Sequence, residues 1–161
     1  MEKQLKENDF IVSKTDLKGY ITYVNQIFME MAEYTETELL GKPHNIVRHP
    51  NMPKAVFQLL WDKIQNKEEI FAFVENKTKN SNSYWVFANV TPSLDNNGKI
   101  IGYLSVRRKP ADDALKIIKP LYQAMLNAEK TSGIAAGTKI LLDTLNEKGV
   151  SYDEFVISIQ Q

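Results

Sequence analysis

The chain has 161 residues, of which 43% are hydrophobic and 25% are charged, as expected for one globular domain with its own core. Twenty Lys and Arg residues balance twenty Asp and Glu residues, so no net positive charge is available to hold a phosphate backbone, and we expect no nucleic-acid binding. The absence of cysteine excludes disulfides, thiolate metal sites, a cysteine nucleophile and a cysteinyl adduct with a cofactor.

Membrane insertion is not expected either. No apolar run approaches the roughly 20 residues that cross a bilayer, and residues 1–7 lack the apolar centre of a secretion signal. We therefore expect a cytoplasmic protein that reaches a membrane only through a partner. Residues 1–9 are interpreted as a charged, helical N-terminal cap, with Leu5 and Phe10 as the only early apolar anchors.

Residues 10–53 predict a hairpin, two short helices and an irregular segment. β-Prone residues 10–13 and 20–25 flank an Asp-Leu-Lys-Gly turn. Residues 27–34 have helical apolar spacing, and Thr35 with Glu38 forms a capping box for a second helix. The segment 41–53 carries three prolines and is expected to be irregular, with at most one helical turn.

A longer helix is expected to begin at Pro53, with one apolar face composed of Val56, Phe57, Leu60, Trp61 and Ile64. Three strands follow at 70–77, 84–92 and 100–108, joined by two hairpin turns. The order of elements predicts an α+β fold, a five-stranded antiparallel sheet with short helices on one face.

Residues 110–161 are predicted to be helical. Pro120 is expected to break or kink the first helix, residues 131–137 to form a small-residue connector, and Ser151 with Glu154 to cap a final helix. An apolar stripe runs through this region at 3-4-3 spacing; it consists of Leu115, Ile118, Tyr122 and Met125. The stripe either contacts a second copy or a receptor, or packs on the chain's own sheet.

Few residues suggest catalysis. The sequence has no nucleophile-elbow context around either histidine, no zinc spacing and no glycine-rich phosphate loop, so we do not expect an enzyme. The segment 48–53 has two interpretations. It is either a surface loop whose Arg48 pairs with a local carboxylate, or the mouth of a cofactor pocket in which Arg48 and His49 meet anionic or carbonyl groups. In the second case Phe57, Ile70 and Val90 supply apolar walls.

The order of elements and several sequence strings resemble a PAS domain, in particular the flavin-binding PAS domain of bacterial aerotaxis receptors. The matching strings include residues 20–25, the Pro-His-Asn-to-Met-Pro-Lys run at 43–54, and residues 76–80, 84–86 and 102–107. The resemblance spans about residues 9–127. The whole chain is still more similar to the stand-alone PAS proteins of bipartite energy-taxis systems. With the charged N-terminus and the shift to helical composition after Pro110, we expect an N-terminal cap at 1–9, a PAS sensor domain at 10–109 and a C-terminal helical extension at 110–161.

This resemblance implies FAD as the cofactor. The flavin contacts of the family fall on Asn25, Arg48, His49, Asn51, Phe57 and Asn76, with Arg48 able to pair with a pyrophosphate. Three positions depart from the family pattern. Ile70 replaces a Trp that helps to hold the flavin, Asn51 replaces an Asp, and Ala72 replaces a Gly. Ile70 therefore stands at a cofactor-binding position without the aromatic contact.

The resemblance implies a redox sensor for energy taxis that signals to a membrane-anchored, HAMP-containing chemoreceptor at the inner membrane. A homodimer is a further expected association. Two alternatives stay open at this point. One is a cofactor-free PAS adaptor whose pocket is collapsed by Ile70 and Ala72, and the other is a haem-based gas sensor with His44 or His49 as the axial ligand. Light sensing through a cysteinyl adduct is excluded.

Overall fold

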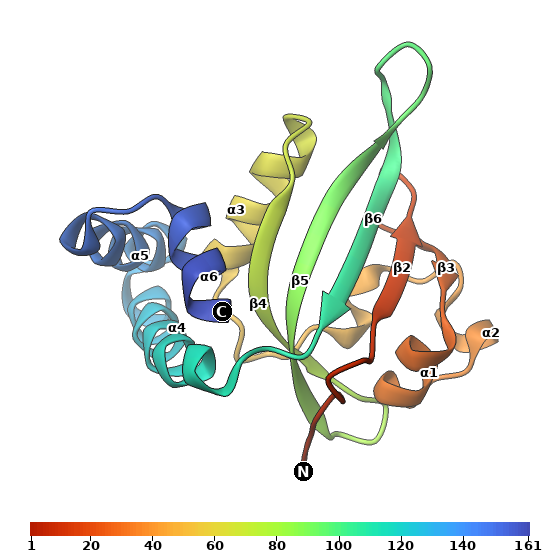
Figure 1. The fold of residues 1–161 in the computed structure, drawn as a ribbon, viewed down its shortest axis with the longest axis horizontal. Coiled ribbons are helices and arrows are strands. Elements are labelled where there is room, and N and C mark those ends of the chain that lie inside the picture. Colours follow the sequence, from red (N-terminus) through yellow and green to blue (C-terminus); the bar gives the residue numbers. More distant parts are fainter.

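The computed structural model describes all 161 residues and is built around one twisted, mixed sheet (Figure 1). Its strands are β1 (Glu2–Lys3), β2 (Ile11–Thr15), β3 (Ile21–Val24), β4 (Ile70–Lys77), β5 (Ser83–Leu94) and β6 (Ile100–Arg108). Its helices are α1 (Gln26–Ala32), α2 (Glu36–Leu39), the 3-10 helix η1 (His44–Val47), α3 (Lys54–Gln65), α4 (Asp112–Ser132), α5 (Ile134–Lys148) and α6 (Tyr152–Gln160).

Five antiparallel strands form the body of the sheet in the order β4-β5-β6-β2-β3, which confirms the predicted α+β, PAS-like architecture. The strands predicted at 70–77 and 100–108 have those bounds, and β5 is longer at both ends than predicted. The capping boxes at Thr35 and Ser151 are both present. Local sequence signals were sufficient for these elements because hairpin turns and caps act over only a few residues.

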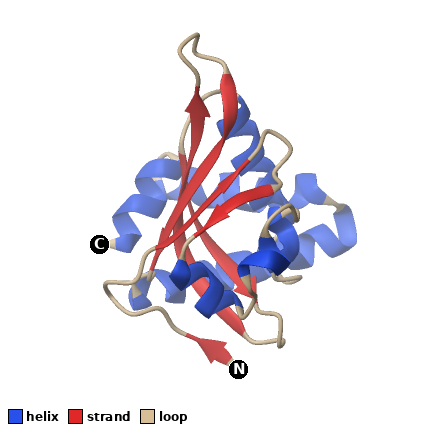
Figure 2. Ribbon diagram, turned by 90° about the vertical axis from the view of Figure 1, so that its right-hand side faces the viewer, coloured by secondary structure: helices blue, strands red, loops and turns tan.

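Alternation along the strands produces two different faces. Even-numbered residues of β4 and odd-numbered residues of β6 point towards α3. Phe73 of β4 and Trp85 of β5 lie on the opposite side, where the ring of Tyr122 from α4 is close to the Trp85 ring. We call these the inner and outer faces of the sheet. Figure 1 shows the C-terminal helices gathered beside β4, on the other side of the molecule from α1 and α2, and Figure 2 shows helices both in front of the sheet and behind it.

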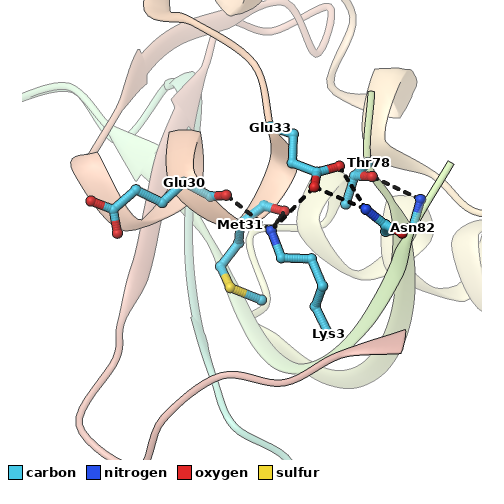
Figure 3. Close-up of polar contacts among 6 residues, drawn as sticks. All are labelled: Lys3, Glu30, Met31, Glu33, Thr78 and Asn82. Atoms are coloured by element: carbon cyan, nitrogen blue, oxygen red, sulfur yellow. Dashed lines mark hydrogen bonds and ion pairs between the residues drawn. The ribbon is translucent and has the colours of Figure 1, made fainter. Parts of the chain in front are cut away.

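The N-terminal segment is a strand and not the helix that its charged sequence predicted. β1 pairs in parallel with Ser83 and Tyr84 of β5, and Leu5 is buried while Phe10 is largely exposed. Lys3 Nζ donates to the carbonyl oxygens of Glu30 (3.1 Å) and Met31 (3.0 Å) at the end of α1, as Figure 3 shows. A cation is favourable there because the last carbonyls of a helix have no intrahelical partner.

Glu33 completes this N-terminal junction (Figure 3). Its carboxylate lies 3.6 Å from Lys3 Nζ and accepts a hydrogen bond of 2.9 Å from Asn82 Nδ2. Hydrogen bonds from Thr78 and Asn82, together with the charge of Lys3, lower the pKa of Glu33. These contacts tie β1 to α1 and to the β4–β5 turn, interactions that only the folded chain brings together.

Pro120 was expected to break or kink the helix; it lies inside α4 without ending it, so of these two outcomes the break is wrong. Ile118 and Tyr122 flank the proline and are both buried, and this packing outweighs the missing amide hydrogen bond. The stripe from Leu115 to Met125 packs into the chain's own core, which decides between its two interpretations: it is not a free surface for a partner. The connector at 131–137 shrinks to Gly133 between two helices.

The C-terminal helices close the free edge of β4. Tyr122 Oη donates to the carbonyl oxygen of Phe73 (2.6 Å), and Tyr152 Oη donates to that of Phe71 (2.8 Å). Both carbonyl oxygens lie at the edge of the sheet and would otherwise have no hydrogen-bond partner. None of the helices combines the length and the hydrophobicity that a membrane span requires.

Glu129 of α4 ties the C-terminal helices to α3. Its two carboxylate oxygens accept hydrogen bonds from the backbone amides of Lys54 (2.8 Å) and Ala55 (3.0 Å), the first two residues of α3. Gly137 of α5 provides the space for this carboxylate, because a Cβ atom at residue 137 would lie 2.4 Å from Glu129 Oε2. The extension is thus fastened to the helix that borders the inner face.

Candidate ligand-binding cavity

A cavity of about 210 Å³ lies between the inner face of the sheet and α3. Its floor consists of Val74 and Asn76 from β4, Ala88 and Val90 from β5, and Tyr103, Ser105 and Arg107 from β6. Its opposite wall consists of Phe57, Leu60, Trp61 and Ile64 from α3. The volume exceeds the 150 Å³ or so that holds a benzene ring, so it accommodates a planar aromatic group.

The remaining wall comes from two irregular segments. The turn after β2 contributes Lys18 and Gly19, and the stretch around η1 contributes Pro43, His44, Asn45, Val47 and Arg48. The proline-rich sequence predicted this irregular course, and the 3-10 turn His44–Val47 is its only helical element. The ring of Trp61 lies 3.5 Å from the position that a side chain at Gly19 would occupy, and it packs edge-on against Tyr103 at 5.6 Å.

The lining of the cavity includes positively charged side chains and no acidic ones. Lys18, Arg48 and Arg107 are among its lining residues, whereas none of those residues is Asp or Glu. Arg48 is half-buried, with its guanidinium carbon 3.7 Å from the ring centroid of Phe57. Burial lowers the pKa of both arginines, that of Arg107 to about 10. Because the ordinary pKa of arginine lies far above neutral pH, both side chains are still charged there. The site therefore favours an anionic or strongly polar ligand.

Three buried polar atoms at the cavity have no hydrogen-bond partner. They are Arg48 Nε, Asn76 Nδ2 and Arg107 Nε, and only one further side-chain atom in the chain, Asp153 Oδ1, shares this property. Buried polar groups are nearly always paired, and an unpaired one costs about 1–3 kcal/mol. Three unpaired donors around one cavity are best explained by acceptors on a ligand.

His44 lines the cavity in a polar cluster with the buried side chains of Ser13 and Arg107, and is itself half-buried. Its Nε2 atom is 2.9 Å from Ser13 Oγ and 3.4 Å from Arg107 Nη1. Burial and the charges of Arg107 and Arg48 lower the pKa of His44 to about 3, so the imidazole is neutral. With Ser13 and Arg107 already at Nε2, this atom is not free for an axial bond to haem iron.

The structure brings only some of the expected contact residues to the cavity. Arg48, Phe57 and Asn76 line it, and Ile70 is fully buried behind its wall, packed with Ile64, Val90 and Tyr103. Asn25 caps α1: its side chain accepts from the amides of Phe28 and Val12 and donates to the carbonyl of Phe10.

His49 and Asn51 lie outside the cavity lining. His49 Nδ1 accepts from the amide of Asn51 (3.0 Å) and lies 3.6 Å from Glu75 Oε1 on the outer face, while the Asn51 side chain is exposed. Arg48 does not pair with a local carboxylate, so the surface-loop interpretation is wrong for that residue. Direct contact of Asn25, His49 or Asn51 with a ligand stays a prediction.

Sequence reasoning did not single out Arg107, Trp61 or Lys18 as cavity residues. A signal for Arg107 was available: Tyr103, Ser105 and Arg107 alternate on one face of a strand, and a cation on an inward-facing position of a buried strand is unusual. Trp61 fitted the apolar face of α3 equally well as a core residue. Its position at the cavity depends on the packing of α3 against the Lys18–Gly19 turn.

Comparisons with known proteins agree with this geometry. The family model for the PAS fold matches residues 21–107, more than half of the chain, and the chain belongs to the PAS family. Its relatives include the aerotaxis receptor of Escherichia coli, which is 44% identical over 128 residues; the match covers 80% of this chain and 25% of the receptor. The nitrogen fixation regulatory protein of Klebsiella pneumoniae is 25% identical over 97 residues, which cover 60% of this chain and 20% of that protein.

Solved structures show the same fold at low sequence identity. The light-state structure of the blue-light photoreceptor Aureochrome1 LOV aligns with a TM-score of 0.60 and 20% identity over 71% of this chain and 90% of that one. A PAS domain from Colwellia psychrerythraea aligns with a TM-score of 0.58 and 19% identity over 62% and 85% of the two chains. Since the chain spans a quarter or less of the two curated relatives named above, these relationships support a PAS signal-sensing role and leave cofactor and partner to be argued from the site.

Proposed function

We propose that the chain binds FAD in the inner-face cavity and relays the redox state of the flavin to a membrane-anchored, HAMP-containing chemoreceptor in energy taxis. The observation that carries this proposal is the set of unpaired donors Arg48 Nε, Asn76 Nδ2 and Arg107 Nε around a cavity without acids. FAD offers acceptors of the required kinds, because its ring bears carbonyl oxygens and its pyrophosphate is anionic.

The aromatic wall fits the same ligand. Phe57, Trp61 and Tyr103 border the cavity, and their rings can contact the faces and edges of a flavin. These rings would replace the aromatic contact that is missing at Ile70, where the aerotaxis receptors that the chain resembles have a Trp. The similarity to the aerotaxis receptor and the solved light-oxygen-voltage domain described with a flavin analogue support a flavin in particular.

FAD would supply a ring system whose charge and protonation change with its oxidation state. The chain's own part would be to hold the ring against Asn76 and Arg107 and to hold the phosphates near the opening, where Lys18 is exposed and Arg48 half-buried. A change of charge on the ring would then alter the hydrogen bonds that these side chains make.

A continuous set of contacts leads from the cavity to the C-terminal helices. Arg48 pairs with Asn76 of β4 through a backbone bridge, and the segment after it leads directly into α3. The first amides of α3 are held by Glu129 of α4. In the proposed relay, a shift of Arg48 moves the start of α3 and, through Glu129, the α4–α5 pair that would meet the receptor.

Absorption spectroscopy tests the cofactor directly. The purified protein is incubated with FAD and desalted, and its near-ultraviolet and visible spectrum is recorded. We expect the two flavin bands to stay with the wild-type protein and with Arg108→Gln, a control on the exposed neighbour of Arg107, and to be lost from Arg48→Met. A colourless wild-type protein would favour the cofactor-free adaptor, and a Soret band in protein as isolated would favour haem.

Receptor contact is tested by co-purification with the candidate receptor. We expect Glu129→Ala to weaken the redox dependence of this contact while the protein keeps its FAD. Equal co-purification with oxidised and reduced wild-type protein would contradict the relay and leave the cofactor assignment intact.

A further inference from the structure

Arg107 is a buried cation without a counter-charge. Its side chain reaches from β6 into the inner end of the cavity and is 3% exposed. The groups it contacts are Ser13 Oγ and His44 Nε2, a neutral hydroxyl and an imidazole that burial keeps neutral. Charged groups in protein interiors are nearly always paired, because removing a charge from water is costly.

The position of Arg107 is fixed by the surrounding core. Its guanidinium carbon lies 4.9 Å from the ring centroid of Phe28, and Ser13 holds one terminal nitrogen. Arg107 Nε remains without a partner, and so does Asn76 Nδ2 on the neighbouring part of the floor.

The three cavity cations lie at different depths. Lys18 is exposed at the opening, Arg48 is half-buried over Phe57, and Arg107 is buried at the inner end. Phosphates of a ligand can be held near the opening, where they retain part of their hydration. The inner cation must meet a different group, one attached to the planar body of the ligand that enters the cavity.

We infer that Arg107, with Asn76 beside it, forms a second anion subsite at the inner end of the cavity, which binds a negatively charged or strongly polarised carbonyl edge of a planar ring. The inference rests on the proposed function, because for FAD this edge is the cyclic imide of the flavin ring. Arg107 would then bind the ligand, and its unpaired buried charge would lower the stability of the ligand-free protein. Asn76 and Arg48 do not account for the burial of the Arg107 guanidinium at the inner end of the cavity. A ligand group that reaches this position does.

The first test compares thermal unfolding of the ligand-free proteins Arg107→Met and Arg108→Met. The control residue is the adjacent arginine, which is exposed on the opposite face. We expect Arg107→Met to raise Tm by about 3 °C or more, because an unpaired buried charge is removed, while Ser13 and His44 stay paired with each other at 2.9 Å. Arg108→Met should change Tm by about 1 °C or less. A lower Tm for Arg107→Met would show that Arg107 serves the fold and would overturn the inference.

The second test measures the affinities for FAD and for riboflavin, which has the same ring and no phosphate. Arg107→Met should weaken both by the same factor, about tenfold or more, whereas Arg48→Met should weaken FAD more than riboflavin. If wild type binds both flavins and Arg107→Met binds them unchanged, the subsite is wrong and the proposed function stands. If wild type binds neither but Arg107→Met melts higher, the proposed function is wrong, and the subsite stands for another planar anion.

Discussion

The two faces of the sheet treat buried polar groups in opposite ways. On the outer face and along the edge of β4, Tyr122 is buried and Tyr152 half-buried, and each hydroxyl donates to a carbonyl of β4. On the inner face, Arg48, Asn76 and Arg107 each retain an unpaired buried atom at the edge of a cavity. Satisfied polar groups stabilise a fold, whereas unsatisfied ones cost stability and persist where another molecule satisfies them. The outer face therefore supplies stability, and the inner face is available for recognition.

The strongest way to break this comparison is to remove an outer-face anchor. Tyr122→Ala should lower the free energy of unfolding by about 3–5 kcal/mol, because a large buried ring and its hydrogen bond are both lost. Tyr122→Phe removes only the hydroxyl and should cost about 1–3 kcal/mol. Urea unfolding measures both effects. FAD affinity of the folded Tyr122→Phe protein should equal that of wild type; a large loss of affinity would show that the two faces are not separate.

Changing the pH tests the cost of the inner face. Burial, with the charges of Arg107 and Arg48, lowers the pKa of His44 to about 3 in the folded chain, whereas its ordinary value is 6.5. Between these pH values the unfolded state binds more protons than the folded state. The contribution of His44 to the free energy of unfolding is therefore fully present above about pH 6.5 and falls by about 1.4 kcal/mol per pH unit below it. Urea unfolding at pH 7.5 and 5.5 should show this loss in wild type and a smaller one in His44→Gln. An equal loss in both proteins would mean that another group titrates.

Arg48→Met sharpens the comparison at the cavity itself. The substitution should lower FAD affinity at least tenfold, or by about 1.4 kcal/mol. Its effect on the ligand-free protein should be no more than about 1 kcal/mol, since the contact with Phe57 is partly exposed. Isothermal titration and urea unfolding measure the two quantities. Lys42→Met, an exposed cation in the same segment, serves as the control. A larger loss of stability than of affinity would contradict the assignment of Arg48 to recognition.

The smallest expected effect concerns the junction between the two sides of the molecule. Glu129→Ala should cost about 1 kcal/mol, because two amides at the start of α3 lose their acceptors. Gly137→Ala should destabilise wild type by displacing Glu129, but in the Glu129→Ala background it should stabilise by up to about 1 kcal/mol through helix propensity. A double-mutant cycle measured by urea unfolding gives this sign change. Additive effects would show that Gly137 does not make room for the carboxylate.

Prediction from the sequence succeeded where short-range signals decide the structure. The strands at 70–77 and 100–108, the capping boxes and the irregular segment before Pro53 follow from alternation, turn residues and proline, which act within a few positions. It failed where distant contacts decide. Residues 1–9 looked helical, but the chain supplies β5 as a pairing partner for β1 and the end of α1 as an acceptor for Lys3.

The candidate site divides in the same way. Arg48 and Asn76 could be assigned in advance because they lie in motif strings that resemble the aerotaxis receptors, and Phe57 because it falls on a flavin-contact position of that family; the structure places all three at the cavity. Asn25 could not be separated from them, since an asparagine that caps a helix and one that binds a ligand look alike in a sequence. The inward-facing position of Arg107 could be inferred from strand alternation, but its lack of a counter-charge exists only after folding.

The sequence by itself determined the PAS fold, the two hairpin turns that join β4, β5 and β6, and the location of a polar, proline-rich segment beside a long amphipathic helix, since periodicity and turn chemistry are local properties. Only the tertiary structure decided which polar side chains are satisfied and which are not. The pairing of the Tyr122 hydroxyl depends on Phe73, 49 positions away in the chain, and the unpaired Nε of Arg107 depends on what the folded chain places around it. The cost of burying a polar atom depends on its neighbours in space, and for that reason the recognition face could be identified only in the folded molecule.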